Sequence, residues 1–131
     1  MKRALMLATV PSMIEQFNMN NIRILQELGY KVDVACNFDD GGTLNQQRVQ
    51  EFKKELEEQK IEYFNIPFSR NPFNFNNIKA YALTKKLVNS NKYDIVHLHS
   101  PIGRCMWQTC LQKNTNEWYF YNIYSTWISF L

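Results

Sequence analysis

The stretch ILQELGYKVDVAC, residues 24–36, decides the fold of this chain. Its first part completes an apolar pattern of helical spacing that stops at Gly29, a residue type common just past a helix C-terminus. The residues of this pattern are Ile14, Phe17, Ile22, Leu25 and Leu28. Its second part opens the segment Lys31–Phe38, where apolar side chains alternate with other residues as in a strand. We therefore expect one helix followed by one strand.

The alternation of strand and helix continues on both sides of this stretch. Upstream, Ala4–Val10 is a continuous apolar run of strand length. Downstream, Asp39–Gly42 is a loop, and Thr43 followed three residues later by Gln46 fits a capping box that opens a second helix. The apolar face of that helix consists of Val49, Phe52 and Leu56.

Two more strands and a third helix are expected before residue 103. Ile61–Phe68 is a strand that ends near Pro67, and Ser69–Asn77 is a loop rich in Asn, Pro and Phe. The third helix runs from about Asn77 to Ser90 and carries Ile78, Tyr81, Ala82, Leu87 and Val88. Tyr93–His99 is the fourth strand.

This order of elements predicts an α/β fold, a Rossmann-like parallel sheet with helices on both faces. In the common strand order 3-2-1-4, the first and fourth strands are neighbours, and ligands bind where the chain reverses direction between them. The loops Val10–Met13 and His99–Ile102 then lie side by side at the carboxyl ends of these strands. They are the first segments in which we expect functional residues.

Length and composition exclude several classes of protein. A chain of 131 residues with 45% hydrophobic residues has the size of one domain, and a net charge of +3 does not indicate a nucleic-acid partner. Three cysteines at no metal-finger spacing indicate a reduced, cytoplasmic chain. The apolar run after Lys2 and Arg3 is too short for a signal peptide or a spanning helix. Membrane contact is therefore expected to be peripheral at most, on the inner face.

Few residues carry an obvious chemical signature. The loop after the first strand has neither G-x-G-x-x-G nor a Walker lysine, so ordinary dinucleotide and P-loop enzymes are not indicated. Ser12 in this loop is expected either to cap the following helix or to hold a sugar hydroxyl.

His97 and His99 share one face of a strand, but no further ligand completes a zinc site. We therefore expect His97 to lie in the core and His99 to lie beside a ligand. Cys36 is expected to be a small buried hydrophobe.

Three segments taken together are typical of one enzyme family. They are MLATV at residues 6–10, the stretch 24–36 and YDIVHLHSP at residues 93–101. A helix, Leu-Gly-x-x-Val and a strand occur in many Rossmann-like domains, and Asp-Ile-Val-His-x-His makes the combination more specific. Over residues 1–103 the chain resembles the N-terminal domain of family 4 glycosyltransferases, retaining GT-B enzymes of bacterial polysaccharide and capsule synthesis.

The resemblance implies half of a two-domain cleft, in which the N-terminal domain binds the acceptor and the C-terminal domain binds a nucleotide sugar. By this resemblance the acceptor-binding residues are Ser12, Met13, Gln16, His99, Ser100 and Pro101. The family's Glu-x7-Glu donor region and its Thr-x-His-Gly element have no counterpart here. No catalytic residue, metal or cofactor is therefore assigned to this chain, and the nucleotide sugar belongs to the full-length family.

Composition changes after Gly103. All three tryptophans and two of the three cysteines lie in residues 104–131, where only one residue is acidic. Codons that are allowed for Tyr124–Leu131 encode Thr-Ala-His-Gly, the missing family element, when they are translated one base later. We therefore expect residues 104–131 to be an aberrant, out-of-frame tail. The alternative is a genuine C-terminal helix and strand with tryptophans in a core or at a membrane interface.

Three functions are compatible with these observations. The first is the acceptor side of a glycosyltransferase that moves a hexose from a nucleotide sugar to a glycan or lipid-linked acceptor, inactive without a donor domain. The second is a single-domain Rossmann-like binding module, or the partner subunit of a split glycosyltransferase. The third is another GT-B-like sugar enzyme, such as a nucleotide-sugar epimerase. No nucleic-acid partner is expected.

Overall fold

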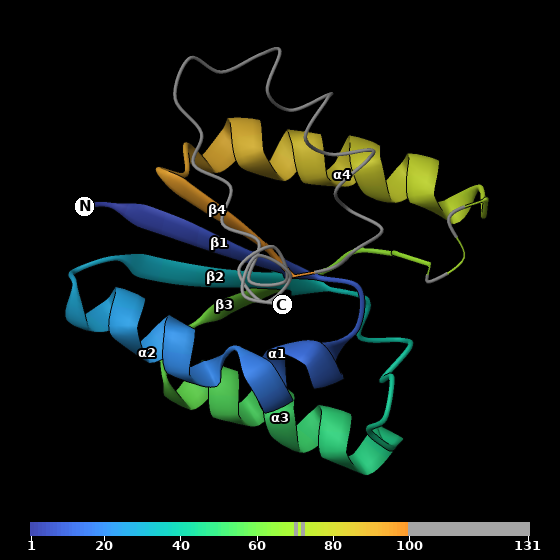
Figure 1. The fold of residues 1–131 in the computed structure, drawn as a ribbon, viewed down its shortest axis with the longest axis horizontal. Helices are drawn as coiled ribbons and strands as arrows, with labels where there is room; N and C mark the ends of the chain where they lie inside the picture. Colours follow the sequence, from blue (N-terminus) through green and yellow to red (C-terminus); the bar gives the residue numbers. More distant parts are fainter. Residues whose placement is uncertain (70, 72, 100–131) are drawn as a thin grey trace, which may run out of the picture.

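The sheet has four parallel strands: β1 Arg3–Ala8, β2 Lys31–Cys36, β3 Glu62–Asn65 and β4 Ile95–His99. A computed structural model describes residues 1–69, 71 and 73–99 of the chain. The strands are arranged in the order β3-β2-β1-β4 (Figure 1). The predicted α/β, Rossmann-like sheet and its strand order 3-2-1-4 are therefore confirmed.

Helices cover both faces of this sheet, as the sequence predicts (Figure 1). One face is covered by α1 Pro11–Phe17, α2 Met19–Glu27 and α3 Gln46–Glu58, and the other by α4 Asn76–Asn91. Because side chains alternate along each strand, the two faces have separate cores. The core beneath α1, α2 and α3 includes Met6, Ile14, Ile22, Val34 and Phe52, and the core beneath α4 includes Leu5, Leu7, Ala35, Ala80 and Val88.

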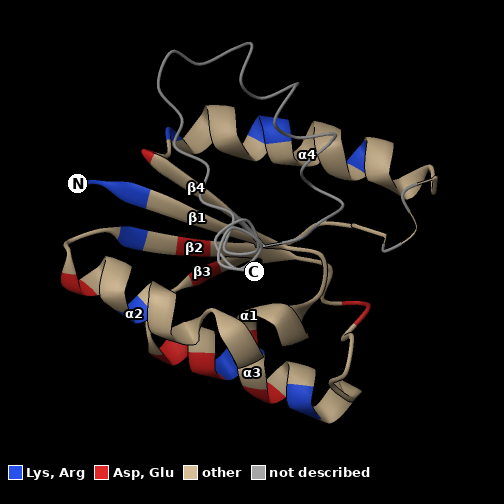
Figure 2. Cartoon of the chain, in the orientation of Figure 1, with Lys and Arg blue, Asp and Glu red and all other residues tan. Residues whose placement is uncertain are grey.

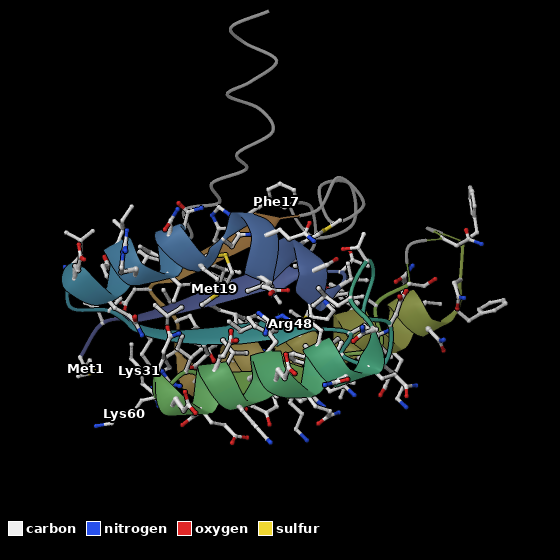
Figure 3. All side chains as sticks on the ribbon, turned by 90° about the horizontal axis from the view of Figure 1, so that it is seen from below. Met1, Phe17, Met19, Lys31, Arg48 and Lys60 are labelled. Atoms are coloured by element: carbon white, nitrogen blue, oxygen red, sulfur yellow. The ribbon has the colours of Figure 1, made fainter. Side chains whose placement is uncertain are left out.

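The prediction of a single helix after β1 is wrong, because the segment forms two helices, α1 and α2, that are separated at Asn18. Asn18 is fully buried, and its side-chain amide donates to the carbonyl of Met13 at 3.0 Å. Its own carbonyl accepts from the N–H of Ile22 at 2.9 Å. The break interrupts the helical periodicity, so Phe17 is 61% exposed and Leu28 is 67% exposed, whereas Ile22 is buried. Figure 3 shows Phe17 on the outer side of α1, away from the sheet.

Other element boundaries differ from the prediction by smaller amounts. The strands are shorter than the apolar runs Ala4–Val10, Lys31–Phe38, Ile61–Phe68 and Tyr93–His99, since each run continues into a buried loop or begins in one. The predicted capping box at Thr43 is wrong: Asn45 caps α3, and its side-chain oxygen accepts from the N–H of Arg48 at 2.8 Å. Gly29 has φ +90°, as expected for the residue after a helix.

The buried face of α4 also differs from the apolar residues in the sequence. Ile78 is 62% exposed, and Asn77, Ala80, Thr84 and Val88 are the buried residues of the helix. The hydroxyl of Thr84 donates to the carbonyl of Ala80 at 2.9 Å, so this buried polar group is satisfied within the helix. The sequence pattern therefore predicted the wrong buried face of α4, and the apolar residue Ile78 lies on its exposed face.

Candidate functional site

The carboxyl ends of β1 and β4 lie next to each other, as the sequence predicts for the ligand-binding edge. Ala8, the last residue of β1, is in register with His99, the last residue of β4. The loop that follows β1 therefore leaves the sheet beside the end of β4. Of His99 only the backbone is described, and Ser100 and Pro101 lie outside the described residues. Their predicted contact with an acceptor stays a prediction.

Ser12 lies inside α1 and joins two loops. The N-cap of α1 is Val10, which makes no side-chain capping hydrogen bond, and Pro11 follows it at the first helical position. Ser12 is 5% exposed, and its hydroxyl accepts from the N–H of Thr43 at 3.5 Å. The capping role expected for Ser12 is therefore wrong. Its side chain instead connects the first turn of α1 to the loop after β2.

Gly42 allows these two loops to approach closely. Its φ is +67°, a value that favours glycine, and a Cβ there would overlap the Ser12 hydroxyl and lie 2.8 Å from Val10 Cγ2. Gly42, in the loop Asp39–Gly42, therefore allows the loop after β2 to lie close to the end of β1.

The remaining predicted residues of α1 differ in exposure. Met13 is partly buried and packs against the core beneath α1, α2 and α3. Gln16 is exposed, and its side-chain amide donates to the hydroxyl of Thr43 at 2.9 Å. Gln16 and Thr43 therefore form a polar pair at the edge of the sheet, and Thr43 was not among the predicted site residues.

Asparagine side chains fix the loops at this edge. The amide of Asn37 donates to the carbonyl of Phe68 at 2.9 Å, which ties the loop after β2 to the segment after β3. Asn65 accepts from the N–H of Phe38 at 3.0 Å and donates to the carboxylate of Asp39 at 3.0 Å. These hydrogen bonds therefore hold the loop after β2 against the end of β3 and the segment that follows it.

A pocket of about 460 Å³ lies between the loop after β2 and the first turns of α3. Its lining residues are Phe38, Asp39, Gly41, Leu44, Gln46, Gln47, Val49, Gln50 and Lys53. The ammonium group of Lys53 lies 5.3 Å from the centre of the Phe38 ring. The pocket therefore places amide, ammonium and carboxylate groups beside one aromatic ring. The sequence signal for this pocket is the run of glutamines at the start of α3, which the prediction did not use.

Arg48 lies between α1 and α3 (Figure 3), and its sequence neighbours Gln47 and Val49 line this pocket. Its guanidinium forms ion pairs with Glu15 of α1 and with Glu55 of α3, the latter at 2.8 Å. Hydrogen bonds to Glu55 and Glu15 raise the pKa of Arg48 above its usual range. The guanidinium therefore stays charged and paired with Glu15 and Glu55, so we assign Arg48 a structural role.

The histidine and cysteine predicted to be buried are buried. His97 is 8% exposed on β4, and Cys36 is fully buried at the end of β2. Burial raises the pKa of the Cys36 thiol, which keeps it protonated and makes a nucleophilic role unfavourable.

Within residues 1–69, 71 and 73–99, no three His, Cys, Asp or Glu side chains are grouped to bind a metal. In the same residues no helix is long and apolar enough to cross a membrane.

Comparisons with solved structures agree with the fold. The chain is similar to a glycosyltransferase from Rickettsia africae ESF-5, with a TM-score of 0.62 and 22% identity over 92% of this chain and 29% of that one. It is also similar to MurG of Acinetobacter baumannii, with a TM-score of 0.53 and 17% identity over 82% of this chain and 33% of that one. At these identities the likeness shows the fold alone, which is the α/β, Rossmann-like fold.

Comparisons of sequence identify the family. A putative glycosyltransferase of Bacillus subtilis strain 168, EpsD, is 32% identical over 102 residues, which are 78% of this chain and 23% of that protein. The chain thus spans about a quarter of the length of this relative. The family model described as glycosyl transferase 4-like matches residues 6–129. The chain therefore belongs to the glycosyl transferase 4-like family.

Proposed function

We propose that this chain supplies the acceptor-binding side of a GT-B glycosyltransferase that transfers a hexose from a nucleotide sugar to a glycan or lipid-linked acceptor. The observation that carries the proposal is the family match over residues 6–129. The relative EpsD, named a putative glycosyltransferase, supports the reaction class. Synthesis of a surface polysaccharide or capsule is the process that we propose for the product.

The acceptor is proposed to bind along the carboxyl edge of the sheet. Gln16 and Thr43 offer an amide and a hydroxyl there, and the pocket beside α3 offers Gln46, Gln50 and Lys53. Ser12 acts as a positioning residue in this proposal, because it is buried and holds the loop that carries Thr43. The contribution of this chain is to orient the acceptor hydroxyl that attacks the donor sugar.

Transfer by the chain alone is not expected. In the proposed enzyme the donor diphosphate, and the charge that develops on it as it leaves, are stabilised by the second domain. One side of a cleft also leaves the donor sugar open to water. Released nucleoside diphosphate should therefore appear only when a donor domain is supplied, whether the same gene or another encodes it.

The experiment is a steady-state assay of the chain combined with the donor domain of a family member. Replacing Gln16 by Ala should raise the KM for the acceptor several-fold and leave the KM for the nucleotide sugar unchanged. Gln59→Ala is the matched control, because Gln59 is exposed at the other end of α3, far from this edge. A change in the donor KM with no change in the acceptor KM would contradict the proposed division of roles.

A split enzyme, in which a separately encoded chain supplies the donor domain, is the second candidate. Co-purification of the chain with a separately encoded donor domain would support it. An epimerase or a free-standing binding module would instead show no transfer with any glycosyltransferase donor domain.

The division at residue 103 and the out-of-frame origin of residues 104–131 stay predictions. Reading the genomic DNA in all three frames tests them. A second domain should follow in the shifted frame, and stop codons in that frame would contradict the hypothesis.

A further inference from the structure

Among the described residues, Lys53 is the one basic residue that lines the pocket beside α3. In the part of the chain that the structure describes, its ammonium group forms no ion pair, whereas the guanidinium groups of Arg3 and Arg48 are paired with carboxylates. Lys53 is half-buried, so solvent ions screen its charge less than they screen a fully exposed lysine. The pocket therefore offers a ligand a positive charge that the protein itself does not neutralise.

An aromatic contact positions this ammonium group and leaves its charge in place. The Nζ atom of Lys53 lies 5.3 Å from the centre of the Phe38 ring, within the range of a cation–π interaction. Phe38 is 4% exposed, and its ring makes an edge-to-face contact with Tyr63 at a centroid distance of 5.2 Å. The ring is therefore fixed in the core, and it holds a charged group at the wall of the pocket.

Two amide side chains lie on the same side of α3 as Lys53. Gln46 and Gln50 are four residues apart, and Lys53 follows Gln46 by seven residues, a spacing that places the three residues on one side of a helix. All of them line the pocket. Because ammonium and amide N–H groups both donate hydrogen bonds, this wall of the pocket can bind the oxygens of a carboxylate or a phosphate.

The acidic residue of the pocket lies on a different element. Asp39 belongs to the loop after β2, and its Oδ2 accepts from the side-chain amide of Asn65 at 3.0 Å. Within the described residues neither Asp39 nor Lys53 takes part in an ion pair. Figure 2 shows acidic positions in this loop and positions of both signs on α3. The arrangement therefore favours an anionic group beside α3 and hydroxyl groups, which can donate to a carboxylate, beside Asp39.

We propose that the pocket beside α3 binds a sugar residue of the acceptor that carries an anionic substituent, either a carboxylate or a phosphate. Lys53 binds the anionic group, Gln46 and Gln50 add hydrogen bonds to it, and Asp39 accepts from hydroxyl groups of the same sugar. The pocket volume of about 460 Å³ lies within the range of roughly 300–1,000 Å³ that is usual for small-molecule sites. A neutral sugar leaves the charge of Lys53 without a partner, so the pocket selects for an acidic sugar.

The assignment of this sugar to the acceptor rests on the proposed function. The pocket is formed by the loop after β2, and Thr43 in the same loop contacts Ser12 and Gln16 of α1 at the carboxyl edge of the sheet. A sugar in the pocket therefore lies at the edge where the acceptor is proposed to bind. Its binding requires no donor, so it can be measured with the chain alone.

The test is an NMR titration of the full chain with the methyl glycosides of glucuronic acid, glucose 6-phosphate and glucose, which differ only at carbon 6. The anionic probes should bind more tightly than the neutral one, and added salt should weaken only the anionic probes. Lys53→Met keeps a long side chain but removes the charge. It should weaken binding of the anionic probes by roughly tenfold, as expected for the loss of one hydrogen bond to a charged group, and leave the neutral probe unaffected. Lys53→Arg retains the charge and should restore most of the affinity.

The matched control is Lys54→Met, which changes the net charge by the same amount. Lys54 is exposed and lies outside the pocket lining, so this variant should bind every probe as wild type does. Circular dichroism checks that each variant is folded. The proposal is overturned if neither anionic probe binds more tightly than the neutral one, or if Lys53→Met and wild type bind the anionic probes equally. Tighter binding of the methyl glycoside of glucosamine, a cation, would also overturn it, because Asp39 would then determine which charge the pocket accepts.

The two anionic probes identify the source of the charge. Tighter binding of the glucuronic acid glycoside assigns a uronic acid to the acceptor, and tighter binding of the phosphate assigns a phosphorylated sugar; both results support an anionic ligand. The titrations contain no nucleotide sugar, so they stand apart from the transferase assay. If the anionic probes bind as expected and no donor domain restores transfer, the proposed function fails and the anionic sugar site remains.

Discussion

Asp33 is a fully buried carboxylate on β2, and we predict that Asp33→Ala is among the most destabilising single substitutions in the domain. Its Oδ2 accepts from the guanidinium of Arg3 at 2.6 Å and from the hydroxyl of Tyr93 at 2.5 Å. Arg3 lies on β1 and Asp33 on β2, and Tyr93 lies two residues before β4. The network is therefore near the amino ends of three adjacent strands, at the edge opposite the candidate site. The network therefore contributes to stability and not to ligand binding.

The expected loss follows from the geometry of this network. Removing one partner of a buried ion pair costs about 3–5 kcal/mol, because the other charge stays buried. Arg3 retains some compensation: its side chain is 23% exposed and also donates to Asn91 at 3.2 Å. We therefore expect Asp33→Ala to lower the free energy of unfolding by about 3 kcal/mol, the lower end of this range. Tyr93→Phe removes one hydrogen bond to a charged group and should cost about 1.5 kcal/mol.

Urea unfolding followed by circular dichroism measures these losses, provided that the transition is two-state. The triple variant Arg3→Met/Asp33→Leu/Tyr93→Phe is the control, since replacing the whole network by apolar groups leaves no unpaired charge and should recover most of the loss. A cost below about 1 kcal/mol for Asp33→Ala, the value of an exposed pair, would refute the reasoning. So would a triple variant that is less stable than Asp33→Ala.

Two further predictions concern the site edge. Gly42→Ala should destabilise the protein more than Gly29→Ala, because both glycines have positive φ but only a Cβ at Gly42 meets other atoms; equal unfolding free energies for the two variants would contradict this. Burial raises the pKa of the Cys36 thiol above its unfolded value of about 8.5, so its contribution to stability is complete below that pH and is lost as the pH rises, because the unfolded thiol ionises first. Urea midpoints from pH 7 to 10 should fall for wild type, and the fall that begins near pH 8.5 should be smaller for Cys36→Val; identical pH profiles would exclude this linkage.

The sheet could be predicted from the sequence because its signals are local and strong. The apolar run after Arg3, the alternation after Lys31 and the glycine at position 29 each specify one element, and the pairing order follows from general rules of α/β folds. The family resemblance likewise depends on contiguous segments, which the family match includes. These features need no knowledge of distant contacts.

The site could be predicted only in part, because its decisive contacts join residues far apart in the sequence. The helix after β1 breaks where the buried amide of Asn18 binds a neighbouring carbonyl, and no periodicity signals this. Ser12 is a serine near a helix start, yet its partner is Thr43 in another loop. The pocket beside α3 needs the loop after β2 to fold over the helix, and the exposed residues of α4 depend on which face of the helix Asn77 buries.

The most direct test of the acceptor-side role is the release of nucleoside diphosphate from a panel of nucleotide sugars, in the presence of lipid-linked and free glycan acceptors. We predict no release above buffer by the purified chain alone, and acceptor-dependent release once the donor domain of a family 4 glycosyltransferase is added. Release by the chain alone would contradict the proposal that the donor is bound and activated by another domain. Absence of release with every donor domain and acceptor tested would contradict the acceptor-side role itself.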